Sequence, residues 1–188
     1  MFAFAGLETT FALLGAQRFG IGPAGLGLAF AGVGVVMVIV QGGLVGRVTD
    51  RWGDRRVAVA GAALLAIGLV ALPFVPAWLS YLTLGVVGVG QGLLSTTTAG
   101  LIAHVGGRRL GSAFGVGQSA AAAARAAGPL VAGAAFDVRA ALPYFVGALL
   151  CLAAMALLNA TRQDAHGARG RDGVPGSSAA TPHPARIP

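Results

Sequence analysis

Residues 26–56 read LGLAFAGVGVVMVIVQGGLVGRVTDRWGDRR, an apolar stretch that ends abruptly in an arginine-rich segment. The apolar part, Leu26–Gly46, contains no charged residue, and about 20 such residues are enough for a helix to cross a bilayer. The segment that follows, Arg47–Arg56, carries four arginines. This contrast predicts a membrane helix and the loop at its end.

Five further runs have a similar apolar character. The chain is 56% hydrophobic and only 10% charged, whereas soluble domains carry about 25% charged residues. A buried soluble helix would show a polar stripe at 3.6-residue spacing, and these runs are apolar nearly all round. We therefore predict an all-α membrane protein in which residues 1–160 form six transmembrane helices. The runs are Met1–Ala16, Leu26–Gly46, Val57–Val75, Trp78–Ala103, Leu110–Phe136 and Ala140–Ala160.

The basic residues indicate the topology. The net charge is +7 and every basic residue is an arginine. These arginines lie in clusters between the apolar runs, so topology explains them better than nucleic-acid binding. Ten arginines fall on one side, in the segments 47–56, 104–109 and the C-terminal tail, against Arg18 and Arg139 on the other. Because the arginine-rich side of a membrane protein faces the cytoplasm, we predict an inner-membrane protein with a cytoplasmic C-terminus.

The two ends of the chain differ from its middle. Residues 161–188 read TRQDAHGARGRDGVPGSSAATPHPARIP, a composition too polar to bury an apolar core, and we expect a disordered cytoplasmic tail. At the other end no removable signal peptide is apparent. Met1 already lies inside an apolar run, so we expect that upstream sequence is missing. Cys151 lies in an apolar run, where a buried core thiol is the expected state.

The arginine-rich loop carries a recognisable order of residues. It reads GRVTDRWGDRR, in which Gly53 permits a sharp turn and Asp50 stands among arginines that can hold it bidentately. This order resembles the loop motif G-x-L-a-D-r-x-G-r-r-x of major facilitator transporters. Val48 replaces the usual Leu, and Asp54 replaces a basic residue and so weakens the positive charge of the loop. The matching residues are Gly46, Asp50, Arg51, Gly53, Arg55 and Arg56.

Two other stretches resemble the drug:proton antiporters of the tetracycline-resistance-like group. In the fifth run Gly128 and Pro129, followed by Gly133, are similar to the antiporter motif, and a proline there can kink a helix. The opening stretch GLETTFA, residues 6–12, is similar to the seventh helix of those exporters. The resemblance implies the C-terminal half of a twelve-helix major facilitator fold. It also implies that the gating loop with Asp50 latches the cytoplasmic side, and that the partner is the missing N-terminal half or a second copy.

Two charged residues lie well inside apolar runs, Glu8 and Arg125. A charge within lipid costs about 2.5–3.5 kcal/mol on insertion scales, so such residues usually face the protein interior and have a function. Glu8 is the best candidate for a proton-carrying carboxylate, because burial favours its neutral form; a contact to a cationic drug or a structural hydrogen bond is the alternative. Arg125 is a candidate partner for Glu8 or for an acid on the missing half, with a structural ion pair as the alternative.

Uncharged polar residues also recur inside the runs. Gln91, Ser95 and Thr98 form a stripe at i, i+4 and i+7 of the fourth run, and Gln118 lies seven residues before Arg125 on one face of the fifth. Such a stripe can line a substrate path, or it can join helices by hydrogen bonds. Three glycine pairs spaced four apart indicate generic close packing of helices. They are Gly42/Gly46, Gly88/Gly92 and Gly111/Gly115.

These features favour proton-coupled efflux of a small amphipathic compound by alternating access, with protons as the coupling ion. A symporter or facilitator that imports a metabolite on the same fold is the alternative, as is a fragment that is inactive alone. An intramembrane serine protease is disfavoured, because Ser95 and His104 are nine residues apart on one run. No metal cluster and no nucleotide-binding loop is apparent, so we expect no cofactor and no enzymatic activity.

Overall fold

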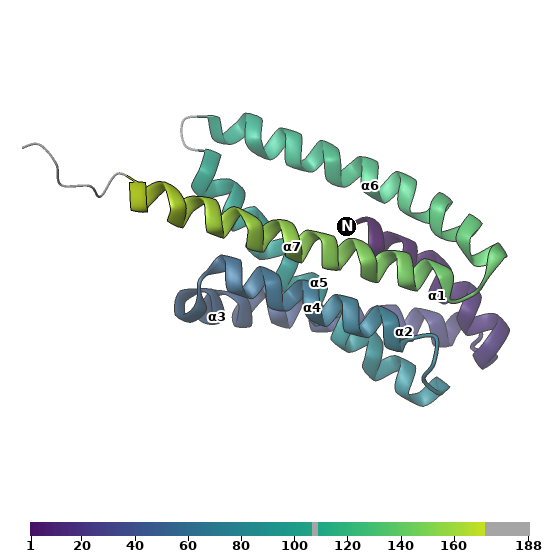
Figure 1. The fold of residues 1–188 in the computed structure, drawn as a ribbon. Coiled ribbons are helices and arrows are strands. Elements are labelled where there is room, and N and C mark those ends of the chain that lie inside the picture. Colours follow the sequence, from purple (N-terminus) through teal and green to yellow (C-terminus); the bar gives the residue numbers. More distant parts are fainter. Residues whose placement is uncertain (107–108, 172–188) are drawn as a thin grey trace, which may run out of the picture.

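The computed structural model describes residues 1–106 and 109–171, and within these ranges the chain is helical apart from short turns. Figure 1 shows long helices side by side, with their connections alternating between the two ends of the bundle. Residues 172–188 of the predicted tail lie outside the described residues, and the disorder of these residues stays a prediction. The helices are α1 (Phe2–Phe19), α2 (Pro23–Ile39), the π-helix η1 (Val40–Leu44), α3 (Val45–Trp52), α4 (Asp54–Ala71), α5 (Ala77–Gly106), α6 (Leu110–Val138) and α7 (Leu142–Arg171).

Helices occur where the six apolar runs predicted them, but several boundaries move. The second run does not end at Gly46, because η1 and α3 continue it in the helical conformation to Trp52. The predicted loop Arg47–Arg56 is therefore mostly helical. A single residue, Gly53, separates α3 from α4. At the other end of the chain, α7 continues past the predicted limit at Ala160 to Arg171.

Among the described residues, three helical segments are long and apolar enough to cross a membrane: Pro23–Trp52, Ala77–His104 and Leu142–Ala160. The first has 30 residues, which at about 1.5 Å per residue exceeds the hydrocarbon thickness of about 30 Å. The remaining helices are more polar: α1 contains Glu8 and Arg18, and α4 begins with three charged residues. That all six runs cross the membrane stays a prediction.

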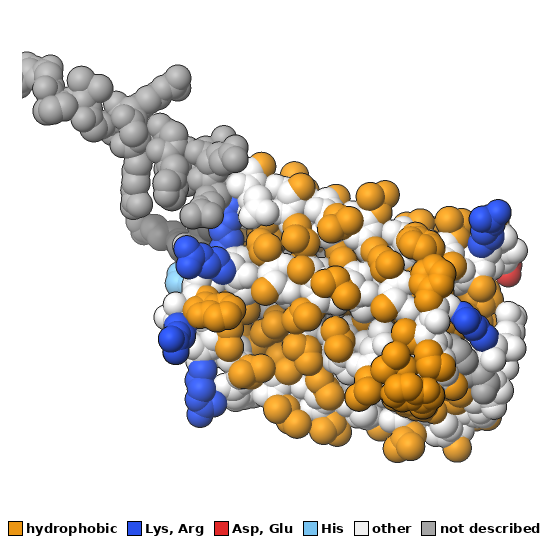
Figure 2. Space-filling view, turned by 60° about the horizontal axis from the view of Figure 1, so that its bottom comes forward, with side chains coloured by type: hydrophobic (Ala, Val, Ile, Leu, Met, Phe, Trp, Pro, Cys, Tyr) orange, Lys and Arg blue, Asp and Glu red, His pale blue; other side chains and the backbone are white. Residues whose placement is uncertain are grey.

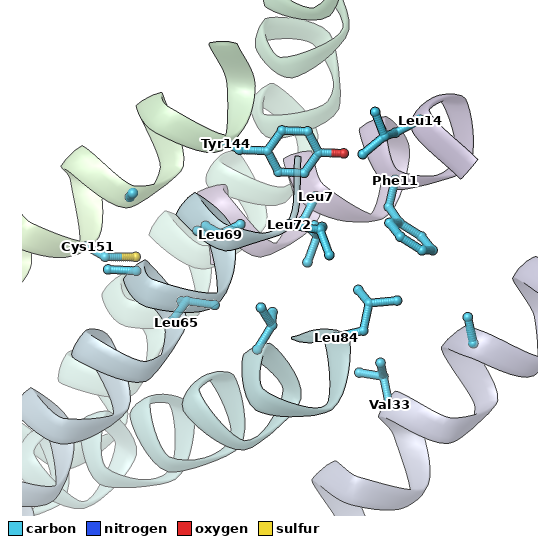
Figure 3. Packing of buried hydrophobic residues seen from close by; sticks show 14 of the residues in the cluster. Leu7, Phe11, Leu14, Val33, Leu65, Leu69, Leu72, Leu84, Tyr144 and Cys151 are labelled. Atoms are coloured by element: carbon cyan, nitrogen blue, oxygen red, sulfur yellow. The ribbon is translucent and has the colours of Figure 1, made fainter. Parts of the chain in front are cut away.

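The core forms where α4 meets its neighbours. α4 packs between α5 and α7, α1 packs on α6 and α7, and α2 packs on α5. Figure 3 shows Leu65 and Leu69 of α4 among these contacts, with Tyr144 and Cys151 projecting from α7. Cys151 is buried and unpaired, which confirms it as a core thiol.

Glycines set how closely the helices approach. A Cβ at Gly90 of α5 would lie 2.6 Å from the backbone nitrogen of Leu65 and 2.7 Å from the carbonyl oxygen of Gly61, both on α4. The backbones of α4 and α5 thus touch directly, as small residues allow in membrane proteins. The four-residue spacing of glycines in the sequence predicted neither position as a helix contact.

Only one of the three predicted glycine pairs lies at a helix contact. Gly88 and Gly92 face α2 and η1, where a Cβ on each would meet Val33 and Val40 at 3.1 Å. A Cβ placed on the glycines of the other two pairs would meet no atom of the described residues within 4 Å. They are Gly42/Gly46 and Gly111/Gly115.

Candidate functional site

A cavity of about 500 Å³ lies between α5, α6 and α7, and Met1 also lines it. Its polar lining comes from Gln91, Ser95 and Thr98 of α5 and Gln118 of α6. These are four of the six residues that the sequence proposed for substrate or proton binding. The structure therefore brings together residues from two helices that are separate in the sequence.

Apolar side chains make up the rest of the cavity wall. Leu94 and Ile102 project from α5, Phe114 from α6, and Leu157 and Leu158 from α7. A concave, mostly apolar space with a few convergent polar groups is the usual form of a small-molecule site. The sequence did not indicate these apolar members, because nothing in an apolar run distinguishes a residue facing a cavity from one facing lipid.

The hydroxyl groups of the polar stripe bond to their own helix. Ser95 Oγ donates to the carbonyl oxygen of Gly92 at 3.1 Å, and Thr98 Oγ1 donates to that of Leu94 at 2.6 Å. Gln91 differs, because it is 2% exposed and its Nε2 donates to Met1 Sδ at 3.3 Å. Of the three residues, Gln91 therefore makes a hydrogen bond to a residue outside α5, whereas these hydrogen bonds of the two hydroxyls stay within α5.

Glu8 and Arg125 lie outside this cavity, on α1 and α6. Both side chains are exposed rather than buried. They interact electrostatically, although the described residues include no ion pair between them within 4 Å. Arg125 lies two helical turns beyond Gln118, about 10 Å along the axis of α6.

The predicted kink in α6 is a place of close helix packing. A Cβ at Gly128 would lie 2.9 Å from the carbonyl oxygen of Phe2, and a Cβ at Gly6 would lie 2.9 Å from Ala132 Cβ. Gly128 therefore lets α1 cross α6. Pro129 follows within one continuous helix, and Gly133 meets no atom of the described residues within 4 Å.

The residues of the predicted gating loop gather at one end of the bundle. Gly53 has φ 80°, a conformation that favours glycine, and its N–H donates to the carbonyl oxygen of Thr49 at 2.7 Å. Arg47 Nη1 donates to the carbonyl oxygen of Gly43 at 3.0 Å. The other loop residues project from the last turn of α3 and the first turn of α4. They are Asp50, Arg51, Arg55 and Arg56.

Asp54, which departs from the family motif, makes a specific contact. Its Oδ2 lies 3.4 Å from His104 Nε2 near the end of α5, and the side chain lies over Gly100. Asp54 also stands at the N-terminus of α4, where the helix dipole favours a negative charge. This acid therefore joins α4 to α5. The sequence could not show this contact, because His104 is distant along the chain.

The residues considered for an intramembrane serine protease lie on one helix of the structure. Ser95 and His104 lie on the single helix α5, about 13 Å apart along its axis, and each has another partner. No group of three or more metal-ligating side chains occurs among the described residues.

Comparison of the sequence with known protein families gives a match. The sequence model of the Major Facilitator Superfamily matches residues 1–185, nearly the whole chain. No curated protein matches the chain.

Proposed function

The chain belongs to the Major Facilitator Superfamily of membrane transporters, and on that premise we propose that it forms one half of a proton-coupled exporter. The substrate is a small amphipathic compound. The cavity between α5, α6 and α7 carries this proposal, because apolar walls surround a few polar side chains there. Its volume of about 500 Å³ suits a drug-sized molecule.

The charged residues on α1 and α6 support a second unit. Glu8 and Arg125 are exposed in the middle of their helices, and charges there are costly against lipid. In this proposal a second six-helix unit, either an N-terminal half or another copy of the chain, covers this face. Alternating access then results when the two units rock about the space between them.

Glu8 has the proton-carrying role in this mechanism. It is the one acidic residue within the apolar runs, and its electrostatic interaction with Arg125 depends on its charge. Protonation of Glu8 weakens its attraction to Arg125. This change in charge on the face that the second unit covers couples proton entry to substrate release.

The orientation follows from the arginines. The end that holds the gating loop also holds the α5–α6 connection and the end of α7, as Figure 1 shows. By the positive-inside rule this end faces the cytoplasm of a cell with the protein in its inner membrane. Asp50 and the arginines around it then latch the cytoplasmic side.

Transport in inverted membrane vesicles tests the coupling. Vesicles that contain the protein should accumulate an amphipathic dye when a proton gradient is imposed, and Glu8→Gln should abolish this uphill accumulation. Asp137→Asn is the matched control, because Asp137 is an exposed acid near the C-terminal end of α6. Uphill transport that persists at the normal rate in Glu8→Gln would show that Glu8 does not carry the proton.

A further inference from the structure

Gln91 holds a buried acceptor atom that no described residue satisfies. The side chain is 2% exposed, its Nε2 donates to Met1 Sδ, and its Oε1 accepts no hydrogen bond within the described part of the chain. An unsatisfied buried polar atom loses its hydrogen bonds to water without replacement, so such atoms are rare in folded proteins. Gln91 lines the cavity, so a rotation of its side-chain amide can turn Oε1 toward an occupant that supplies the missing donor.

The neighbouring hydroxyls have the same polarity. Ser95 and Thr98 have already given their hydrogen atoms to carbonyl oxygens of α5. What they present to the cavity is the remaining lone pairs, which only accept hydrogen bonds. The α5 side of the cavity is therefore a wall of acceptors at three positions. Gln118 on α6 can turn either its oxygen or its NH₂ toward a ligand.

The charge of the cavity lining further limits the class of ligand. No aspartate or glutamate is among the described residues that line the cavity, so these residues offer a cation no counter-ion, and a charge in an apolar space without one is costly. An uncharged molecule does not have this cost. Leu94, Ile102 and Phe114 offer it apolar contact.

We propose that the cavity binds an uncharged, mostly apolar molecule with one O–H or N–H group, such as a phenol, which donates a hydrogen bond to Gln91 Oε1. This inference rests on the proposed function in one respect, that the cavity is the substrate site. It goes beyond that function because it specifies a neutral hydrogen-bond donor. The competing occupant is water, which can also donate to Gln91.

A pair of matched ligands tests the proposal without any mutation. We would measure the binding of 2-naphthol and 2-methoxynaphthalene to the full chain in lipid nanodiscs, with empty nanodiscs to correct for partition into lipid. The two have similar shape, but only the first has a donor. We expect saturable binding of 2-naphthol, about tenfold tighter than that of the ether, because one hydrogen bond contributes up to about 1.5 kcal/mol.

Two variants then test whether the preference for 2-naphthol depends on Gln91. Gln91→Leu should reduce the ratio of the two affinities to about one, whereas Gln41→Leu should leave it unchanged, since Gln41 is exposed on η1 and outside the cavity. Equal affinities in the unaltered protein, or no saturable binding, would overturn the proposal and leave water as the occupant. So would a preference that survives Gln91→Leu.

This experiment can fail separately from the proposed function. A donor preference that depends on Gln91, together with an absence of dye transport in vesicles, would support the ligand class and contradict the exporter. Active dye transport with equal affinities for the two naphthalenes would contradict the ligand class alone.

Discussion

At the scale of single residues, Gly53 and Asp54 determine how the gating loop is built. Gly53 ends α3 with φ 80° and ψ 146°, a backbone region that is nearly restricted to glycine. Asp54 follows at once and contacts His104 on α5. One residue thus sets the direction of α4, and the next fixes its first turn to the neighbouring helix.

Replacing Gly53 with alanine should therefore destabilise the protein. We expect Gly53→Ala to lower the free energy of unfolding by about 1–3 kcal/mol, because a Cβ is strained at this φ and ψ. The measurement is denaturation by SDS in mixed detergent micelles. Gly27→Ala is the control, since Gly27 lies within α2 and a Cβ there would meet no described atom within 4 Å. Equal stability of the two variants would contradict the strain.

The contact between Asp54 and His104 should couple the two residues energetically. In a double-mutant cycle with Asp54→Asn and His104→Gln, we expect a coupling of up to about 1 kcal/mol, because the His104 side chain is largely exposed to water. The measurement is again denaturation by SDS in mixed micelles. Strictly additive effects of the two substitutions would show that the contact does not stabilise the fold.

At the scale of elements, direct backbone contact between α4 and α5 holds the centre of the bundle. Gly61 and Gly90 face each other at this contact, and α4 also packs on α7. A side chain larger than hydrogen at Gly90 would force the two helices apart. Because α5 provides three polar residues of the cavity, its position also determines the shape of the candidate site.

A pair of glycine substitutions on α5 tests this contact. Gly90→Ala should lower the free energy of unfolding by about 1–3 kcal/mol through overpacking, and Gly85→Ala should change it little. At Gly85 a Cβ would meet no described atom within 4 Å, whereas at Gly90 it would meet the α4 backbone at 2.6 Å. The same denaturation assay applies, and similar stabilities of the two variants would place the contact elsewhere.

The elements also show how far the sequence predicts the structure. Long apolar runs predicted the described helices other than α3, because a chain in lipid must satisfy its backbone hydrogen bonds internally. The sequence assigned most of α3 to a loop. The four-residue spacing of glycines did not predict which glycines lie at helix contacts. A Cβ at Gly42 or Gly46 would meet no described atom within 4 Å, whereas a Cβ at Gly61 or Gly90 would meet the backbone of the neighbouring helix. Contact depends on which faces of two helices meet, and a periodic pattern within one helix does not contain that information.

In the candidate site, too, the sequence could identify individual residues but not the contacts between helices. Gln91, Ser95, Thr98 and Gln118 could be selected from the sequence because polar residues are rare in apolar runs. Their common cavity depends on how α5, α6 and α7 splay, which no local pattern determines. The contact of Asp54 with His104 was missed for the same reason, because it joins the ends of two helices that meet only in the folded chain.

At the scale of the whole molecule, charge and apolar surface are separated. Figure 2 shows arginine side chains at the two ends of the visible face and apolar side chains between them. Large apolar side chains such as Leu28, Val38 and Ile67 are exposed. A surface of this kind suits a bilayer, with its charged ends in the two aqueous phases.

Labelling of single cysteines tests this arrangement most directly. In a Cys151→Ala background, Trp52→Cys and Ala140→Cys would place one thiol at each end of the bundle, both at exposed positions. In intact cells a membrane-impermeant maleimide should label Ala140→Cys and should label Trp52→Cys only after permeabilisation. Labelling of Trp52→Cys in intact cells would contradict the orientation, and with it the cytoplasmic gating loop and the direction of transport built on it.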